Sequence, residues 1–106
     1  MAYDGRQTTE ERCGILCEAL QRYMDEERRA PITMTDATEA IWGTSGRGNP
    51  NAALKIEALA TLGYVKVMQV GKRMRKVQLT DKGMQAADHY RKSHDDYGNR
   101  LDTAAK

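Results

Sequence analysis

The segment from Gly63 to Leu79 limits the possible folds of this chain more than any other part of the sequence. Two short runs rich in β-branched residues, 64–70 and 76–79, flank a polar segment that begins with glycine, Gly71–Arg75. Runs of this kind on either side of a short turn segment predict a β-hairpin. The sequence therefore predicts a projecting hairpin with a basic tip.

The predicted hairpin carries a concentrated positive charge. Its bases are Lys66, Lys72, Arg73, Arg75 and Lys76, and no acid interrupts them, so the segment has a formal charge of +5 in a chain whose total is +2. The remainder sums to −3, which places the positive field on one element. Such bases are suited to phosphate contact. Solvated bases also keep a hairpin tip in water, but we favour phosphate contact because no acid is present.

Length and composition indicate one soluble globular domain. A chain of 106 residues has room for a single modest core, and 40% hydrophobic with 30% charged residues is ordinary for a folded soluble protein. The apolar runs are too short to span a membrane, and the first residues lack the apolar region of a secretory signal. We therefore expect a cytoplasmic protein without membrane association, in which Cys13 and Cys17 are reduced thiols.

Helix and strand signals surround the hairpin. Thr8–Glu11 has the form of a capping box, and Gly43 and Gly63 are placed to end later helices. The first predicted helix begins after Thr8 and ends within Asp25–Arg29, and an extended segment, Ile32–Met34, follows it beside the hairpin. The second helix runs from its cap Thr35 to Trp42 and is followed by a flexible glycine-rich segment, Gly43–Gly48. The third helix runs from its cap Asn49 to Leu62, and the fourth runs from its cap Thr80 to about His94. Residues 1–7 and 95–106 lack a repeating apolar face and are expected to be flexible, which leaves 8–94 as the domain.

Apolar residues recur at helical spacing in each predicted helix and indicate which face is buried. Expected core positions are Cys13, Leu16, Cys17, Leu20 and Met24 in the first helix, Ala37, Ala40, Ile41 and Trp42 in the second, Ala52, Ile56 and Leu59 in the third, and Met84, Ala87 and Tyr90 in the fourth. On the third helix, Asn51, Leu54, Lys55 and Ala58 lie on or beside the opposite face.

Two segments around the hairpin carry a resemblance to a known family. The first segment is Leu59-Ala60-Thr61-Leu62-Gly63-Tyr64-Val65, and after a basic turn the second is Val77-Gln78-Leu79-Thr80-Asp81-Lys82-Gly83. Together they resemble the L-x-x-x-G-[YLI]-[VI] … [VL]-x-LT-x-x-G signature of the multiple-antibiotic-resistance (MarR-type) and phenolic-acid (PadR-type) repressors. The resemblance covers roughly residues 32–90. It implies an α+β, mainly helical fold, the winged helix-turn-helix, with a three-helix core, a β-hairpin wing and a C-terminal helix.

The resemblance also implies a function. In the family, the third helix enters the major groove of DNA and the wing lies along the phosphate backbone or reaches the minor groove. A small transcriptional regulator, acting as a repressor and homodimer on double-stranded DNA in the nucleoid, is therefore expected, with dimer contacts from the first and fourth helices. The residues expected to contact DNA are Arg47, Asn49, Asn51, Leu54 and Lys55 on and beside the helix, and Lys72, Arg73, Arg75 and Lys76 on the wing.

Several of these assignments have alternatives. Asn49 is more suited to capping its helix than to contacting adenine, whereas Asn51 fits either role. The third helix offers little positive charge besides Lys55, and the chain is shorter than family members that bind a ligand between long helices, so no small-molecule ligand is expected. The same fold in a protein–protein interaction module, or in a replication or plasmid-maintenance factor, is also compatible with the sequence.

Catalysis and cofactors are not expected. No carboxylate pair is placed beside a nucleophile or a base, and the glycine-rich segment lacks the G-x-x-x-x-G-K-[ST] pattern of a nucleotide-binding loop. Cys13 and Cys17 lie on a regular helix, while His89 and His94 are five positions apart and point to different helix faces, which argues against zinc.

Overall fold

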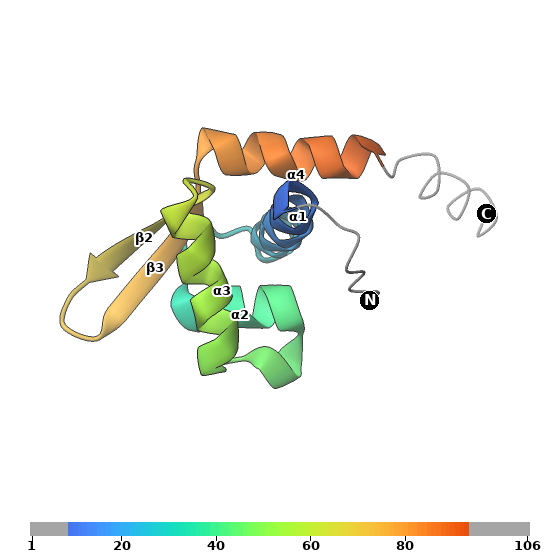
Figure 1. Cartoon of the computed structure of the whole chain (residues 1–106). Helices are drawn as coiled ribbons and strands as arrows, with labels where there is room; N and C mark the ends of the chain where they lie inside the picture. Colours follow the sequence, from blue (N-terminus) through green and yellow to red (C-terminus); the bar gives the residue numbers. More distant parts are fainter. Residues whose placement is uncertain (1–8, 94–106) are drawn as a thin grey trace.

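Four α-helices and a three-stranded antiparallel sheet make up residues 9–93, the part of the chain that this computed structural model describes (Figure 1). The elements are α1 (Thr9–Glu27), β1 (Ile32–Thr33), α2 (Met34–Trp42), a short 3-10 helix η1 (Thr44–Gly46), α3 (Pro50–Thr61), β2 (Val65–Val70), β3 (Met74–Leu79) and α4 (Asp81–Ser93). This mainly helical α+β fold and its element order agree with the prediction. The predicted Thr8 cap, the His94 helix end and both chain ends (1–7 and 95–106) lie outside the described residues.

The sheet has the strand order β1-β3-β2. The short strand β1 pairs with β3 through Ile32 and Val77, which confirms the predicted pairing beside the hairpin. The hairpin turn is shorter than predicted because Val70 pairs with Met74, so β3 begins there and the turn contains only residues 71–73. The positive φ of Gly71, 69°, and a 3.0 Å hydrogen bond from Gln69 Nε2 to the Gly71 carbonyl shape this turn. We call β2, the turn and β3 the wing, and residues 71–73 its tip.

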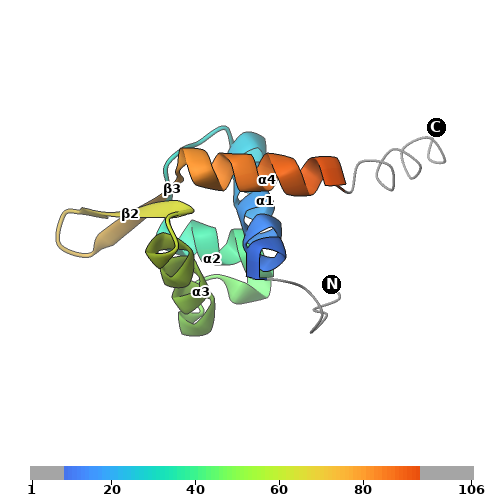
Figure 2. The ribbon, with the colours of Figure 1, turned by 45° about the horizontal axis from the view of Figure 1, so that its top comes forward.

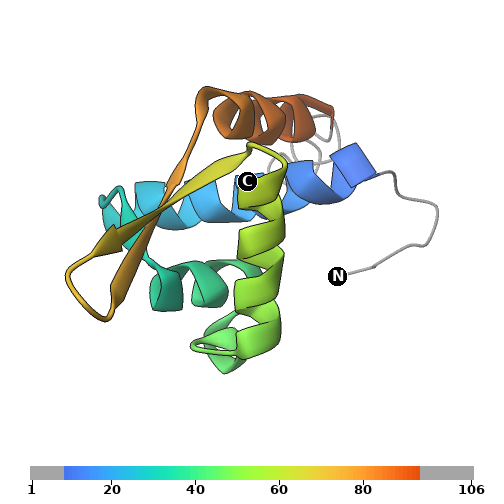
Figure 3. The ribbon, with the colours of Figure 1, turned by 60° about the vertical axis from the view of Figure 1, so that its left-hand side comes forward.

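The core lies between the helices and one face of the sheet. Figure 3 shows α1 between α4 and α2, while the wing projects away from the helices. The largest fully buried side chains are Leu20, Ile32, Ile56, Leu59, Val77, Thr38 and Cys17. The predicted buried faces of α1 and α3 are therefore confirmed, and both cysteines are buried free thiols. None of the helices within residues 9–93 is long and apolar enough to cross a membrane.

Helices α1 and α4 approach each other closely where they cross (Figure 2). A Cβ atom at Gly14 would lie 3.3 Å from the Cβ of Tyr90, so glycine permits this approach. Next to it, the buried carboxylate of Glu18 accepts hydrogen bonds from Arg22 and lies 3.7 Å from Nη2 of Arg91. Helical periodicity did not predict these contacts, because it identifies an apolar face but not its partner.

Thr80 joins the base of the wing to α4. Its hydroxyl donates to the Gly63 carbonyl at 2.6 Å and accepts from the Gly83 amide at 3.1 Å, so it caps α4 as predicted. Its own amide donates to the carbonyl of Tyr64 at 3.1 Å. A Cβ atom at Gly83 would lie 2.0 Å from that same Tyr64 oxygen, which explains why glycine occupies this position.

The structure corrects the prediction at α2 and at two large side chains. The cap of α2 is Thr33 and not Thr35, since the Thr33 hydroxyl accepts from the Asp36 amide at 3.0 Å. Trp42 is 41% exposed rather than buried, because it is the last residue of α2 and lies beyond Ala40 and Ile41, which pack against the core. Met84 is also exposed, at 45%, whereas Ala87 on the same helix is buried.

Candidate nucleic-acid interface

An open groove of about 780 Å³ separates α3 from the wing. Its walls are the first turn of α2, including Thr35, one side of α3, including Leu54 and Glu57, and the segment Arg73–Arg75 of the wing. Arg47 and Gly48 lie at its end beside the start of α3. We call this depression the α3–wing groove; it brings together residues from both segments that the sequence predicted to contact DNA.

The outer face of α3 presents neutral side chains beside one lysine. Asn51, Leu54, Lys55 and Ala58 are all exposed as predicted, and Leu54 is the most exposed large apolar residue of the described chain at 62%. Asn49 caps the helix, because its Oδ1 accepts from the amides of Asn51 at 2.8 Å and of the next residue at 3.4 Å. The structure thus places Asn51, and not Asn49, with its side chain on the exposed face.

The four wing bases predicted to contact DNA occupy different positions. Lys72 and Arg73 are exposed at the tip, where no ion pair to either of them is found among residues 9–93. Arg75 points toward α3, and its Nη1 lies 3.4 Å from Oε1 of Glu57. Lys76 is half-buried in β3 next to β1. The tip therefore carries the positive charge that is free to meet an anion.

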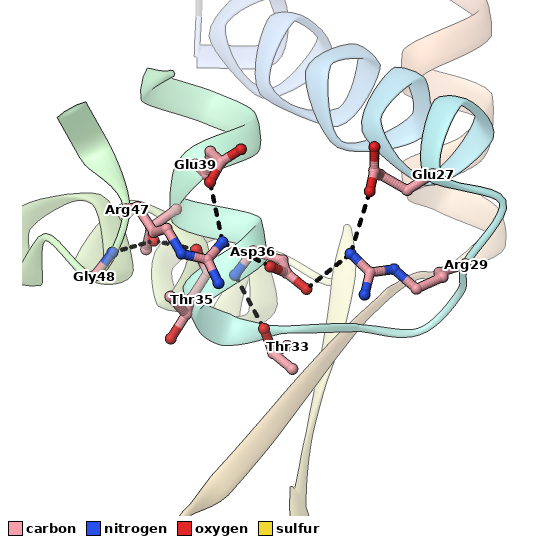
Figure 4. Close-up of polar contacts among 9 residues, drawn as sticks. Glu27, Arg29, Thr33, Thr35, Asp36, Glu39, Arg47 and Gly48 are labelled. Carbon is pink, nitrogen blue, oxygen red and sulfur yellow. Dashed lines mark hydrogen bonds and ion pairs between the residues drawn. The ribbon is translucent and has the colours of Figure 1, made fainter. Parts of the chain in front are cut away.

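Arg47 is held by carboxylates (Figure 4). Its Nη1 donates to Oδ1 of Asp36 at 2.8 Å and to Oε1 of Glu39 at 3.0 Å, while Arg29 lies 3.4 Å from the other oxygen of Asp36. The Asp36 side chain is only 9% exposed. Burial alone would raise the pKa of Asp36, but hydrogen bonds from Arg47 and Thr33 and the charge of Arg29 outweigh it and hold this pKa below its ordinary value.

Thr38 fixes the connection from α2 to α3. Its side chain is 1% exposed, and its hydroxyl donates to the Thr35 carbonyl at 2.6 Å and accepts from the Gly48 amide at 2.9 Å. Together with the contacts of Arg47, these bonds attach the segment Gly43–Gly48 to α2. The prediction that this segment is flexible is wrong in this structure, because it contains the 3-10 helix η1 and a buried glycine, Gly46.

Sequence reasoning missed nine of the residues that line the groove, among them Thr35, Glu57 and Met74. The sequence predicts Thr35 as a cap and Met74 as part of the turn. Glu57 follows Leu54 by three positions, a spacing that places both on one side of a helix, and this was the available signal. Among residues 9–93, no cluster of three or more His, Cys, Asp or Glu side chains could hold a metal ion.

Of the comparisons with known proteins, the one with solved structures finds a similar fold. No protein-family model matches the sequence, and no curated protein matches it either. Among solved structures, the chain is similar to the crystal structure of MepR, a transcription regulator of the Staphylococcus aureus multidrug efflux pump MepA, with a TM-score of 0.60 and 17% identity. The similarity covers 93% of this chain and 66% of the MepR chain, so this chain spans just under two thirds of MepR. At this identity the likeness shows the fold alone, and the expected winged-helix fold is confirmed.

Proposed function

We propose that this protein binds double-stranded DNA as a small transcriptional regulator, with α3 in the major groove and the wing on the phosphate backbone. The observation that carries the proposal is the α3–wing groove, which sets a projecting, acid-free basic hairpin beside an exposed and nearly neutral helix face. Phosphate attraction and base contact need these two kinds of surface. The fold shared with MepR, itself a transcription regulator, supports the same assignment.

The outer face of α3 has the chemistry for reading base edges. A helix of about 10–12 Å diameter fits the major groove, which is about 12 Å wide, and side chains on the helix face that enters the groove reach the bases. Asn51 offers an amide for adenine, and the exposed side chain of Leu54 offers an apolar contact for the methyl group of thymine. Lys55 supplies a single charge for guanine or phosphate.

The wing supplies the electrostatic part of binding. Lys72 and Arg73 at the tip, with Arg75 on the groove wall, neutralise phosphates that border the major groove entered by α3. Each phosphate neutralised releases counterions and makes the affinity salt-dependent. Arg47 has a different role in this proposal: it stays bonded to Asp36 and Glu39 and positions the start of α3.

We further propose a homodimer formed through α1 and α4, as the MarR-type resemblance implies. Two facts support it: Met84 on α4 remains 45% exposed, and α1 packs closely on α4, so that the two helices form one continuous surface. Light scattering of the full chain tests this proposal: a mass of two chains supports the dimer, and a mass of one chain at the concentrations used for DNA binding refutes it.

A protein–protein interaction module is the second candidate. The observation that favours it is Leu54, which is 62% exposed on a helix face with little charge, a feature equally suited to an apolar pocket of a partner. Absence of DNA binding at low salt would support this candidate.

Titration of the full chain into a short random-sequence duplex at about 50 mM and about 200 mM salt tests DNA binding. The variant Lys72→Gln/Arg73→Gln should bind more weakly, and its slope of log affinity against log salt should fall by about 1.8, since about 0.9 is lost per phosphate contact. The control Lys92→Gln removes one exposed positive charge near the end of α4, away from the wing (Figure 1), and should keep the wild-type slope. Equal slopes for all three proteins would contradict the assignment of the wing.

A further inference from the structure

Glu57 is an acid on a surface that otherwise favours anions. Among the described residues that line the α3–wing groove, it is the one with a carboxylate, and its side chain is 48% exposed on the third turn of α3. Its Oε1 lies 3.4 Å from Nη1 of Arg75. A carboxylate at this place repels phosphates, so a DNA-binding groove has an electrostatic cost that needs a compensating contact.

Arg75 compensates part of this cost. A guanidinium group has five N–H donors, so Arg75 can bind a phosphate and remain bonded to Glu57. The carboxylate has about four acceptor sites and no donor, and one contact with Arg75 leaves acceptor capacity directed at the groove. In a complex with DNA, this remaining capacity is satisfied by interfacial water or by a hydrogen-bond donor of the nucleic acid.

The donors available in the major groove are few. They are the exocyclic amino groups of cytosine and adenine, whereas guanine and thymine present acceptors at the corresponding positions. The position of Glu57 on α3 fits this contact, because it lies three residues after Leu54, whose exposed side chain is on the same side of the helix. An apolar group and an acceptor therefore lie side by side where adjacent base pairs would be.

We propose that Glu57 is a specificity-determining residue of the DNA site. Its carboxylate accepts a hydrogen bond from the amino group of a cytosine or an adenine and disfavours duplexes that present guanine or thymine at that position. This inference rests on the proposed function. It assigns to Glu57 a role beyond its ion pair with Arg75, a pair with both side chains about 40–50% exposed, which by itself stabilises the fold very little.

Selection of bound duplexes from a random pool tests the inference, with the wild type, Glu57→Gln and a control compared. The control is Asp88→Asn, which also removes one negative charge from an exposed helix position, here one paired with Lys92 at 3.0 Å on α4. For the wild type we expect one position of each selected half-site to be enriched in cytosine or adenine. In Glu57→Gln that position should lose its enrichment in cytosine and admit guanine and thymine, because an amide both donates and accepts, while the other positions and the whole Asp88→Asn profile stay as in the wild type.

Affinity for random duplex provides a second readout. Glu57→Gln should bind it about two- to fivefold more tightly than Asp88→Asn, since it removes the repulsion between the carboxylate and the phosphates. Identical selected sequences and identical affinities for the two variants would refute the role of Glu57 alone. Relaxation at every position together would also refute it, because that result means a general loss of docking. Failure of the wild type to bind any duplex at low salt would instead refute the proposed function on which this inference rests.

Discussion

The two ends of the α3–wing groove both present arginine, but in opposite settings. At the α2–α3 end, Arg47 is bonded to two carboxylates, one of them nearly buried, in a segment further fixed by Thr38. At the wing end, Arg73 is exposed on a three-residue tip and pairs with no acid among the described residues. The same side chain therefore stabilises the fold at one end and offers charge to a ligand at the other. The difference comes from acids elsewhere in the chain, and substitutions at the two ends should separate stability from binding.

The largest expected change in stability comes from adding one methyl group at the α2–α3 end of the groove. In Gly46→Ala the new Cβ would lie 2.4 Å from the Cβ of Trp42 and 3.0 Å from the Thr38 carbonyl, so the segment must shift, and we expect the free energy of unfolding to fall by about 3 kcal/mol. The same change at the tip, Gly71→Ala, meets no atom within 4 Å and has only its positive φ to oppose it, which costs about 1 kcal/mol. Urea denaturation measures both, and equal losses would mean that the two ends do not differ in rigidity.

A smaller effect is expected from removing one hydroxyl. Thr38→Val keeps the shape of the side chain but leaves the Gly48 amide and the Thr35 carbonyl without their buried partner, so the free energy of unfolding should fall by about 2 kcal/mol. Thr61→Val is the matched control, because the Thr61 hydroxyl donates to a carbonyl of its own helix on the exposed surface. Its expected change is within about 0.5 kcal/mol. A loss in the Thr38 variant no larger than in this control would show that η1 does not depend on Thr38.

The smallest of the three effects is a change in pH dependence. Because the pKa of Asp36 is lowered in the folded state, its contribution is complete above the ordinary carboxyl pKa of about 3.9 and is lost as pH falls through the lowered value. Asp36→Asn should therefore be about 1 kcal/mol less stable at pH 7 and should lose less stability than the wild type on acidification to pH 3. Urea unfolding at the two pH values measures this, with the exposed Asp25→Asn as control. Parallel losses in the wild type and Asp36→Asn would rule out Asp36 as the titrating group.

Local signals in the sequence predicted most of the fold. Thr80, Asn49 and Gly43 act at helix ends as expected, since a cap depends on residues within one turn of it. The β-hairpin and the buried faces of α1 and α3 follow from periodicity. Local spacing is compatible with a cap at either Thr33 or Thr35, so the sequence does not distinguish them. In the structure the cap is Thr33, which is also the last residue of β1 and pairs with β3.

The candidate site was harder to predict because its key contacts join distant residues. The Arg75–Glu57 pair spans 18 positions and the Arg47–Asp36 pair spans 11, and neither has a local pattern. Composition correctly indicated that the wing is basic, but it could not show which bases are engaged by acids. The exposure of Trp42 is not predicted for a similar reason, since periodicity does not show where along α2 the contact with the core ends.

The contacts of Thr80 and Gly83 at the base of the wing have a consequence for the evolution of winged-helix proteins like this one. Thr80 and Gly83 close both ends of the hairpin on Gly63 and Tyr64, so the geometry of the stem is set by four positions that the tip does not touch. Residues 68–74 can therefore vary in length, charge and apolar content during evolution without a change in the arrangement of the helices. A new ligand preference can evolve in this hairpin without a new fold.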